Sequence, residues 1–205
     1  MPVIVIANPK GGVGKSTLAT NVAGCLAAAG HGVMLGDVDR QQSARQWLAQ
    51  RPAQLAPIRG WDVAHDDIVR PPKGTTHVVL DTPAGLHGKR LDAVLRIADT
   101  VLVPLQASLF DIQATHAFVQ ALQAHRRAGE LRIGLVGMRV REHTLSNEQL
   151  HHYLATLPVP VVAWLRDTQN YVHLAARGLT LFDVAPGRVE KDLEQWRALC
   201  QWLDA

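Results

Sequence analysis

The feature that most constrains this chain is a glycine-rich loop between an apolar run and a stretch of helical periodicity. Residues 3–7 are apolar and mostly β-branched, the letters PKGGVGKST follow over residues 9–17, and helical spacing begins at Leu18. Glycines at these positions let successive backbone N–H groups converge on anionic oxygens, and the following helix N-terminus adds partial positive charge. The sequence therefore predicts a strand, a phosphate-binding loop and a helix in direct succession.

Short β-branched runs and amphipathic stretches alternate along the rest of the chain. The predicted strands are residues 3–7, 33–36, 77–80, 100–104, 133–137 and 159–164. The predicted helices are 18–29, 86–97, 109–124, 147–157, 170–176 and 189–203, with Gly30, Gly129 and Gly178 as left-handed caps. This alternation is typical of an α/β fold with a doubly wound, mostly parallel sheet flanked by helices, whose ligands bind at the carboxyl ends of the strands.

The stretch from 51 to 74 is less regular, since it holds four prolines and few periodic apolar residues. We expect it to contain one short strand and one short helix. A length of 205 residues predicts a single domain over 1–205.

Composition narrows the function classes only modestly. An apolar fraction of 47% and a charged fraction of 19% are those of a soluble globular protein, and no apolar run reaches the length of a membrane span. The net charge of +3 permits contact with nucleic acid or an anionic membrane without requiring either. Cys25 and Cys200 have no metal-binding spacing, so we expect no disulfide framework, no iron–sulfur site and no structural zinc. These features favour a cytoplasmic location.

The positions of Lys15, Ser16 and Thr17 in the phosphate loop predict a role for each of these side chains. Lys15 is placed to reach the β- and γ-phosphates, Ser16 to offer its hydroxyl to Mg²⁺, and Thr17 to contact the α-phosphate. The backbone of Gly11, Gly12, Val13 and Gly14 would cradle the phosphate oxygens.

Carboxylates follow two of the predicted strands. Asp37 and Asp39 end the second strand, and their spacing sends both side chains the same way on an extended chain. Asp81 ends a hydrophobic strand and would hold Mg²⁺ through water, because this ion keeps much of its hydration shell. No glutamate follows Asp81, which argues against motor-type ATPases that use such a residue as a base.

The loop departs from the generic G-x-x-x-x-G-K-[ST] pattern, because Pro9 stands where the first glycine is expected and a second lysine, Lys10, lies five residues before Lys15. This arrangement resembles the ParA/MinD family of deviant Walker-A P-loop ATPases, closest to the small ParA-type partition and positioning ATPases. The D-x-D segment at 37–39 and the segments 99–106 and 178–183 also resemble that family. The likeness covers nearly the whole chain and is strongest over 3–106. Arg40 replaces the usual proline, and Met138-Arg139 stand where relatives often carry asparagine.

The resemblance implies a slow ATPase that uses ATP and Mg²⁺, forms a homodimer around ATP and is stimulated by a partner. Lys10 would cross to the phosphates bound by the other subunit, and Asp39 would orient the attacking water. Asp37 would support Mg²⁺ or Lys15. Candidates for enclosing the base are Arg139, Arg166, Asp167, Val184 and Pro186.

The resemblance also implies that the ATP-bound dimer binds a surface and partitions or positions a cargo. The cargo would be a plasmid, a chromosome or a protein assembly. In ParA-type relatives the surface is non-specific DNA of the nucleoid, and an adaptor of the ParB type stimulates hydrolysis through a short basic segment. Our candidate DNA contacts are Arg126, Arg127, Arg139, Arg141, Arg166, Arg177 and Arg188.

Two alternatives remain open, namely a membrane-associated ATPase of the MinD type and a dimeric scaffold with negligible hydrolysis. The acidic residues within the last predicted helix favour packing on the domain over membrane insertion. A nitrogenase-reductase-like electron carrier would need cysteines that ligate a cluster between subunits, and neither Cys25 nor Cys200 lies in a loop suited to this. The adjacent His151 and His152 point about 100° apart on a helix, so we expect surface histidines rather than a metal site.

Overall fold

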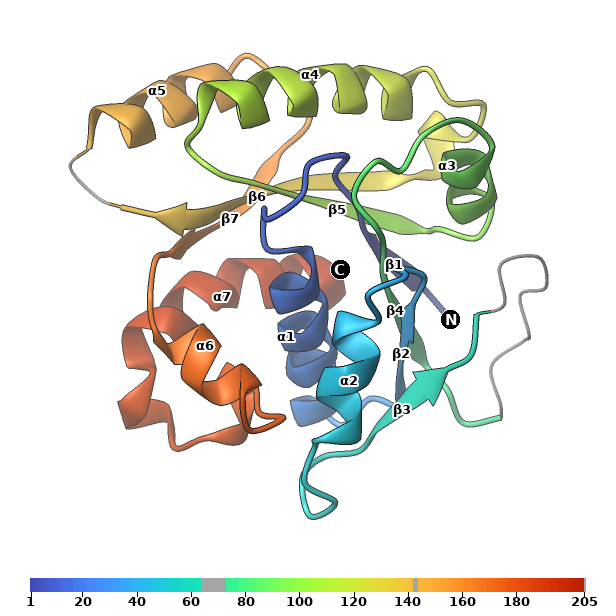
Figure 1. Ribbon diagram of the computed structural model, residues 1–205, viewed down its shortest axis with the longest axis vertical. Coiled ribbons are helices and arrows are strands. Elements are labelled where there is room, and N and C mark those ends of the chain that lie inside the picture. The colour runs from blue at the N-terminus through green and yellow to red at the C-terminus, as the bar shows by residue number, and fades with distance from the viewer. Residues whose placement is uncertain (64–72, 142–143, 205) are drawn as a thin grey trace.

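The computed structural model describes residues 1–63, 73–141 and 144–204, with the backbone alone for 109–111. Seven strands form one sheet in the order β3-β2-β4-β1-β5-β6-β7 (Figure 1). All pairs of neighbouring strands are parallel. The strands are β1 Val3–Ile6, β2 Val33–Asp37, β3 Ile58–Trp61, β4 His77–Asp81, β5 Thr100–Leu105, β6 Arg132–Val140 and β7 Val161–Arg166. The doubly wound α/β prediction is confirmed.

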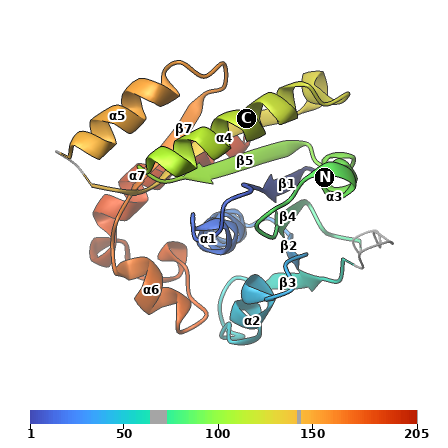
Figure 2. The same cartoon turned by 45° about the horizontal axis from the view of Figure 1, so that its top comes forward.

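Helices cover both faces of the sheet (Figures 1 and 2). One face carries α1 Lys15–Ala28, α2 Ser43–Ala49, α6 Asn170–Ala175 and α7 Glu190–Asp204. The other carries α3 Gly88–Leu95, α4 Leu109–Gln123 and α5 Leu145–Leu154. Short 3-10 turns lie at Ala128–Glu130, Leu181–Asp183 and Pro186–Arg188.

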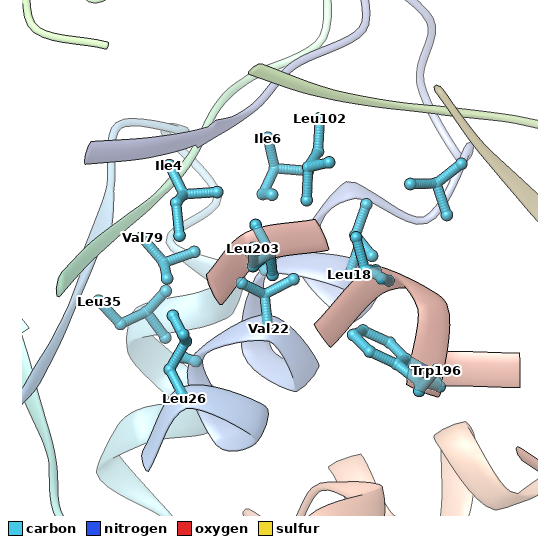
Figure 3. Close-up of a cluster of buried hydrophobic side chains, with 14 of the residues drawn as sticks. Ile4, Ile6, Leu18, Val22, Leu26, Leu35, Val79, Leu102, Trp196 and Leu203 are labelled. Carbon is cyan, nitrogen blue, oxygen red and sulfur yellow. The ribbon is translucent and has the colours of Figure 1, made fainter. Parts of the chain in front are cut away.

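The central strand β1 feeds both layers of the core. Ile4 and Ile6 pack toward α1 and α7, whereas Val3 and Val5 pack toward the other face, as strand alternation requires. Figure 3 shows Leu18 and Val22 of α1 within the first of these clusters. Each fully buried aliphatic side chain stabilises the fold by roughly 1.5–3 kcal/mol. Helix α1, and with it the loop that precedes it, is thus held firmly against the sheet.

Most predicted elements are present, with ends displaced by a few residues. Helix α2 was not predicted, and β3 is the short strand expected in the irregular stretch. The short helix expected in the same stretch is absent from residues 51–63 and 73–74, and residues 64–72 lie outside the described residues. Gly30 and Gly178 have the expected positive φ of 89° and 68°. The prediction for Gly129 is wrong, because it lies within a 3-10 turn and has no positive φ.

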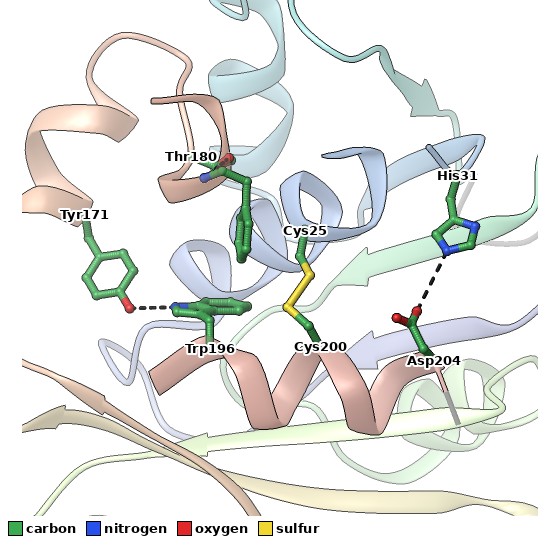
Figure 4. Close-up of a disulfide and its surroundings, with 8 residues drawn as sticks. Cys25, His31, Tyr171, Thr180, Trp196, Cys200 and Asp204 are labelled. Atoms are coloured by element: carbon green, nitrogen blue, oxygen red, sulfur yellow. Dashed lines mark hydrogen bonds and ion pairs between the residues drawn. A yellow bond between two sulfur atoms is a disulfide. The ribbon is translucent and has the colours of Figure 1, made fainter. Parts of the chain in front are cut away.

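The two cysteines differ from expectation, since Cys25 of α1 and Cys200 of α7 form a disulfide (Figure 4). No sequence motif joins them because they lie 175 positions apart, and only the packing of both helices on one face brings their Cα atoms within 6.8 Å.

The prediction that the last helix packs on the domain is confirmed. Trp196, Leu199 and Leu203 are buried, and the Trp196 indole donates to the Tyr171 hydroxyl at 2.8 Å (Figure 4). Within the described ranges, no helix has the length and apolar character needed to cross a bilayer.

Candidate functional site

The phosphate loop joins β1 to α1 and depends on two left-handed glycines. Gly12 and Gly14 have φ values of 77° and 94°. A Cβ on Gly14 would also lie 2.9 Å from the Met138 side chain at the end of β6. Glycine is therefore required at position 14 both for its backbone conformation and for the close approach of β6.

Asn8, which is fully buried, anchors the start of this loop. Its side-chain amide donates to the Pro104 carbonyl at 2.8 Å and to the Thr115 hydroxyl at 3.1 Å. Its side-chain oxygen accepts from the Lys10 backbone N–H at 2.9 Å. The loop is thus tied to β5 and α4 before it reaches the glycines.

Lys15 lies at the N-terminus of α1 with its ammonium turned back onto the loop. Nζ donates to the carbonyl oxygens of Lys10 at 2.7 Å and of Asn8 at 3.1 Å. Burial lowers the pKa of Lys15, while the charges of Asp81 and Asp39 act in the opposite direction. The ammonium therefore lies beside the predicted phosphate position, where phosphate oxygens could replace the two carbonyl partners.

Asp81, at the end of β4, has a buried carboxylate without a hydrogen-bond partner among the described residues. It is 1% exposed, and neither oxygen accepts a hydrogen bond of normal geometry from the described residues. Burial foremost raises its pKa to about 7; the Asp37 and Asp39 charges add to this, whereas interactions with the Ser16 hydroxyl and Lys15 oppose it. An unpartnered buried carboxylate near a serine hydroxyl fits the hydration shell of Mg²⁺. Ser16 and Asp81 are thus brought together as predicted.

Asp37 has a different local task. Oδ2 accepts from the backbone N–H groups of Ala44 at 2.8 Å and Arg45 at 3.2 Å, and Oδ1 accepts from that of Asp39 at 2.9 Å. The carboxylate at the end of β2 therefore caps the first turn of α2. Its predicted support of Mg²⁺ or Lys15 stays a prediction.

Asp39 lies in a tight turn over residues 38–42, which we call the acidic turn. Its Oδ1 accepts from the Gln41 backbone N–H at 3.0 Å. Gln42, with φ of 51°, donates from its side-chain amide to the carbonyls of Asp37 at 2.9 Å and Asp39 at 2.8 Å. Gln42 therefore fixes the turn, a role that the sequence did not indicate.

A cavity of about 1100 Å³ adjoins the loop, which is ample for a nucleotide. Gly11, Gly12, Gly14, Lys15, Ser16 and Thr17 line one side of it, and Asp39 lines another. Gln106, missed by sequence reasoning, donates from its side-chain amide to the Gly12 carbonyl at 2.8 Å. Val13 is buried and does not line this cavity.

The predicted base-enclosing residues are only partly brought together. Arg139 lines the cavity, with φ of 51° where the pairing of β6 with β7 shifts register. Arg166 instead binds the buried Asp192 through Nε at 2.5 Å, and Asp167 pairs with Arg141 at 2.6 Å. Pro186 lines a second hollow beside the disulfide, and Val184 is half-buried next to a 3-10 turn.

The predicted DNA contacts lie at two edges of the sheet. Arg126 and Arg127 follow α4 and precede β6, at the amino edge. The Arg127 guanidinium donates to the carbonyls of Leu95, Arg96 and Ala98, so it holds the fold together. Of the remaining five, Arg139 lies near the end of β6, Arg166 is the last residue of β7, and Arg141, Arg177 and Arg188 follow these strands along the chain. All of these except Arg166 are exposed. The candidate set does not form one continuous surface around the sheet.

Comparison with known proteins agrees with this geometry. Residues 4–181 match the profile of the CobQ/CobB/MinD/ParA nucleotide binding domain. The chain is 37% identical over 116 residues to the carboxysome distribution maintenance protein A of Gloeobacter kilaueensis, covering 54% of this chain and 51% of that relative. The match therefore spans about half of that relative's length.

A second relative is the chromosome-partitioning ATPase Soj of Thermus thermophilus, which is 30% identical over 169 residues, covering 67% of this chain and 68% of the relative. Among solved structures, MinD of Pyrococcus horikoshii complexed with Mg-ADP superposes with a TM-score of 0.71 at 17% identity, covering 99% and 96% of the two chains. This likeness supports the fold.

Proposed function

Because the chain belongs to the CobQ/CobB/MinD/ParA family of nucleotide-binding domains, we propose that it is a positioning ATPase that dimerises around ATP. The observation that carries the proposal is the phosphate loop with two lysines in different settings. Lys15 is buried with its ammonium on loop carbonyls, whereas the half-exposed Lys10 side chain forms no ion pair or hydrogen bond with any described residue. One lysine is placed to serve its own loop, and the other is available to a second subunit.

In the proposed reaction, water attacks the γ-phosphorus of ATP and the bond to the β–γ bridging oxygen breaks. Lys15 exchanges its carbonyl partners for phosphate oxygens and neutralises charge that develops on the β- and γ-phosphates. Lys10 does the same for the nucleotide of the neighbouring subunit. Asp39 accepts a hydrogen bond from the attacking water and so orients it, because the protein's part in phosphoryl transfer is chiefly positioning and charge stabilisation.

Ser16 and Asp81 would hold Mg²⁺, with Asp37 behind them. The ion would supply neutralisation of charge on the β- and γ-phosphate oxygens. The orphaned oxygens of Asp81 and the nearby Ser16 hydroxyl support this assignment.

We further propose that the ATP-bound dimer binds DNA without sequence preference, resides on the nucleoid in the cytoplasm, and releases or moves a plasmid, chromosome or protein assembly when a ParB-type adaptor stimulates hydrolysis. Dimerisation doubles the exposed cations of the candidate set, including Arg141, Arg177 and Arg188, and counterion release then strengthens binding. The apolar stripe of α7 is buried on the domain, which disfavours a membrane as the surface.

Analytical ultracentrifugation of three chains tests the central step. We expect the wild type to dimerise with ATP and Mg²⁺, Lys10→Ala to bind ATP as a monomer, and Lys15→Ala to bind ATP more weakly than the wild type. A wild type that stays monomeric with every nucleotide would refute the dimer. Phosphate release with and without DNA then distinguishes an ATPase from a scaffold that only binds ATP.

DNA binding compared in ADP, in ATP and without nucleotide tests the proposed surface. We expect binding in ATP that weakens steeply between low and physiological salt. Binding that is indifferent to salt would contradict the electrostatic account, and binding only to anionic vesicles would favour the membrane alternative.

A further inference from the structure

The cavity beside the phosphate loop continues well past the phosphate position, toward α3. Its far part is lined by four cations from two separate segments, namely Arg40, Lys89, Arg90 and Arg96. Arg40 comes from the acidic turn, and the other three lie on or directly after α3. All four residues are exposed. We call this part of the cavity the α3 pocket.

The cations of the α3 pocket have no counter-charges among the described residues. None of their side chains forms an ion pair or a hydrogen bond in the ranges 1–63, 73–141 and 144–204. Some other exposed arginines do have carboxylate partners: Arg45 pairs with Asp62, and Arg141 pairs with Asp167. Four like charges around one concave site focus a positive potential there, which favours an anionic ligand.

The floor of the α3 pocket is apolar. Val63, Val94 and Ile97 are partly buried and pack on the core that underlies α3. Leu86, in the loop between β4 and α3, is buried and lines the same cavity. A nucleic-acid backbone would meet the cations but would leave this floor uncovered, because phosphates and sugars present no comparable apolar groups. A peptide with both acidic and apolar side chains satisfies the rim and the floor together.

We propose that the α3 pocket binds an acidic, apolar peptide segment of a partner protein. The role of this contact rests on the proposed function, since the partner would act on the ATPase through Arg40, the neighbour of Asp39 in the acidic turn. The segment is opposite in charge to the basic one that the family resemblance implies for an adaptor. The two segments are therefore different ligands.

Fluorescence anisotropy with the full, nucleotide-free chain tests this contact. The probes are a labelled peptide of Glu, Leu and Phe, an oligoglutamate of equal length, a peptide in which Lys replaces Glu, and a DNA duplex. We expect the first peptide to bind most tightly, oligoglutamate more weakly, and the lysine peptide not at all. Binding of the first peptide should weaken as salt rises.

Charge reversal locates the site. We expect Arg90→Glu combined with Arg96→Glu to weaken the Glu/Leu/Phe peptide by about tenfold or more, and the matched Gln double variant to fall between. The control is Lys191→Glu combined with Arg197→Glu, which makes the same charge change on the exposed side of α7 and should leave binding near wild type. Circular dichroism of each variant checks that it remains folded.

Three results would overturn the proposal. They are no binding of the Glu/Leu/Phe peptide, equal weakening of its binding by the control variant, and binding of the DNA duplex alone that is weakened by the substitutions at Arg90 and Arg96. Because these measurements omit nucleotide, a chain that binds the peptide but never dimerises in ATP would refute the proposed function while leaving the α3 pocket standing.

Discussion

Two charged regions of the molecule treat polar side chains differently. Around β1, β2 and β4, Asp81 has no described hydrogen-bond partner and Lys15 binds only loop carbonyls. Around β7 and the C-terminal segment, the polar groups satisfy one another. Arg51 binds Asp183 through two contacts of 2.8 Å, and Arg166 binds Asp192. The first part is arranged for a ligand and the second for the stability of the fold, although both are rich in charge.

The Arg51–Asp183 pair shows how complete the second arrangement is. Each side chain is 5% exposed, and Asp183 also accepts from the Thr180 backbone N–H and hydroxyl, both at 2.7 Å. Burial by itself would raise the pKa of Asp183, but the bonds from Arg51 and Thr180 and the charge of Arg51 lower it overall. This ionised pair links the segment after α2 to the segment before α7.

The largest expected effect tests whether this second part is structural. Asp183→Ala should lower the free energy of unfolding by about 3–5 kcal/mol, because it leaves the Arg51 guanidinium buried and unpaired. Denaturant titration measures the change. Glu130→Ala, which removes the exposed partner of Arg127, is the matched control and should cost about 1 kcal/mol or less. Equal losses in both variants would break the comparison.

The same pair gives a pH dependence. Since the pKa of Asp183 is lowered in the folded chain, the pair contributes fully above the unfolded value of about 3.9 and is lost as the pH falls below it. The stability gap between wild type and Asp183→Ala should therefore shrink on acidification below about pH 4.

The next effect tests the ligand-binding part. Lys15→Ala should lower the rate of phosphate release by about 10²–10³, because one preorganised charge at the phosphates is lost. The unfolding free energy should change far less than in Asp183→Ala. Phosphate release under saturating ATP measures the rate. A variant with near wild-type turnover would show that the buried ammonium has only a structural role.

Asp81→Asn should have opposite effects on stability and on binding. Burial holds the pKa of Asp81 near 7, so an ionised carboxylate destabilises the nucleotide-free chain at pH 8. We expect the amide to raise the unfolding free energy by roughly 2–4 kcal/mol and to remove the extra stabilisation by Mg²⁺ and nucleotide. Thermal unfolding with and without ligand measures both; the exposed Asp62→Asn is the control. A destabilised Asp81→Asn would mean that the carboxylate is already well partnered.

The smallest effect concerns Gln106. Its hydrogen bond to the Gly12 carbonyl is worth about 1 kcal/mol, so Gln106→Ala should weaken nucleotide binding by roughly fivefold. Titration with a fluorescent ADP analogue measures the affinity, and the exposed Gln113→Ala on α4 serves as control. Unchanged affinity would show that Asn8 alone suffices to hold the loop.

Local patterns made the phosphate loop and most strands predictable, because β-branched runs and glycine spacing act over a few residues. Helix α2 escaped because it is short and its N-terminus is capped by Asp37 from the preceding strand. The Cys25–Cys200 pair and the α3 pocket depend on residues far apart in sequence, which only the packed fold brings together. Charge alone singled out the candidate arginines, and it could not reveal that Arg141 and Arg166 have carboxylate partners about 26 positions away in the sequence.

The capping role of Asp37 has a mechanical consequence. Its carboxylate links the end of β2 to the first turn of α2, so both ends of the five-residue acidic turn are fixed in place. Any displacement of Asp39 toward a bound phosphate must therefore come from changes in the backbone dihedral angles of residues 38–42, while α2 itself stays in place. Such a short segment can move Asp39 only over a small distance, and the hydrogen bonds of the Gln42 side chain stabilise its resting conformation.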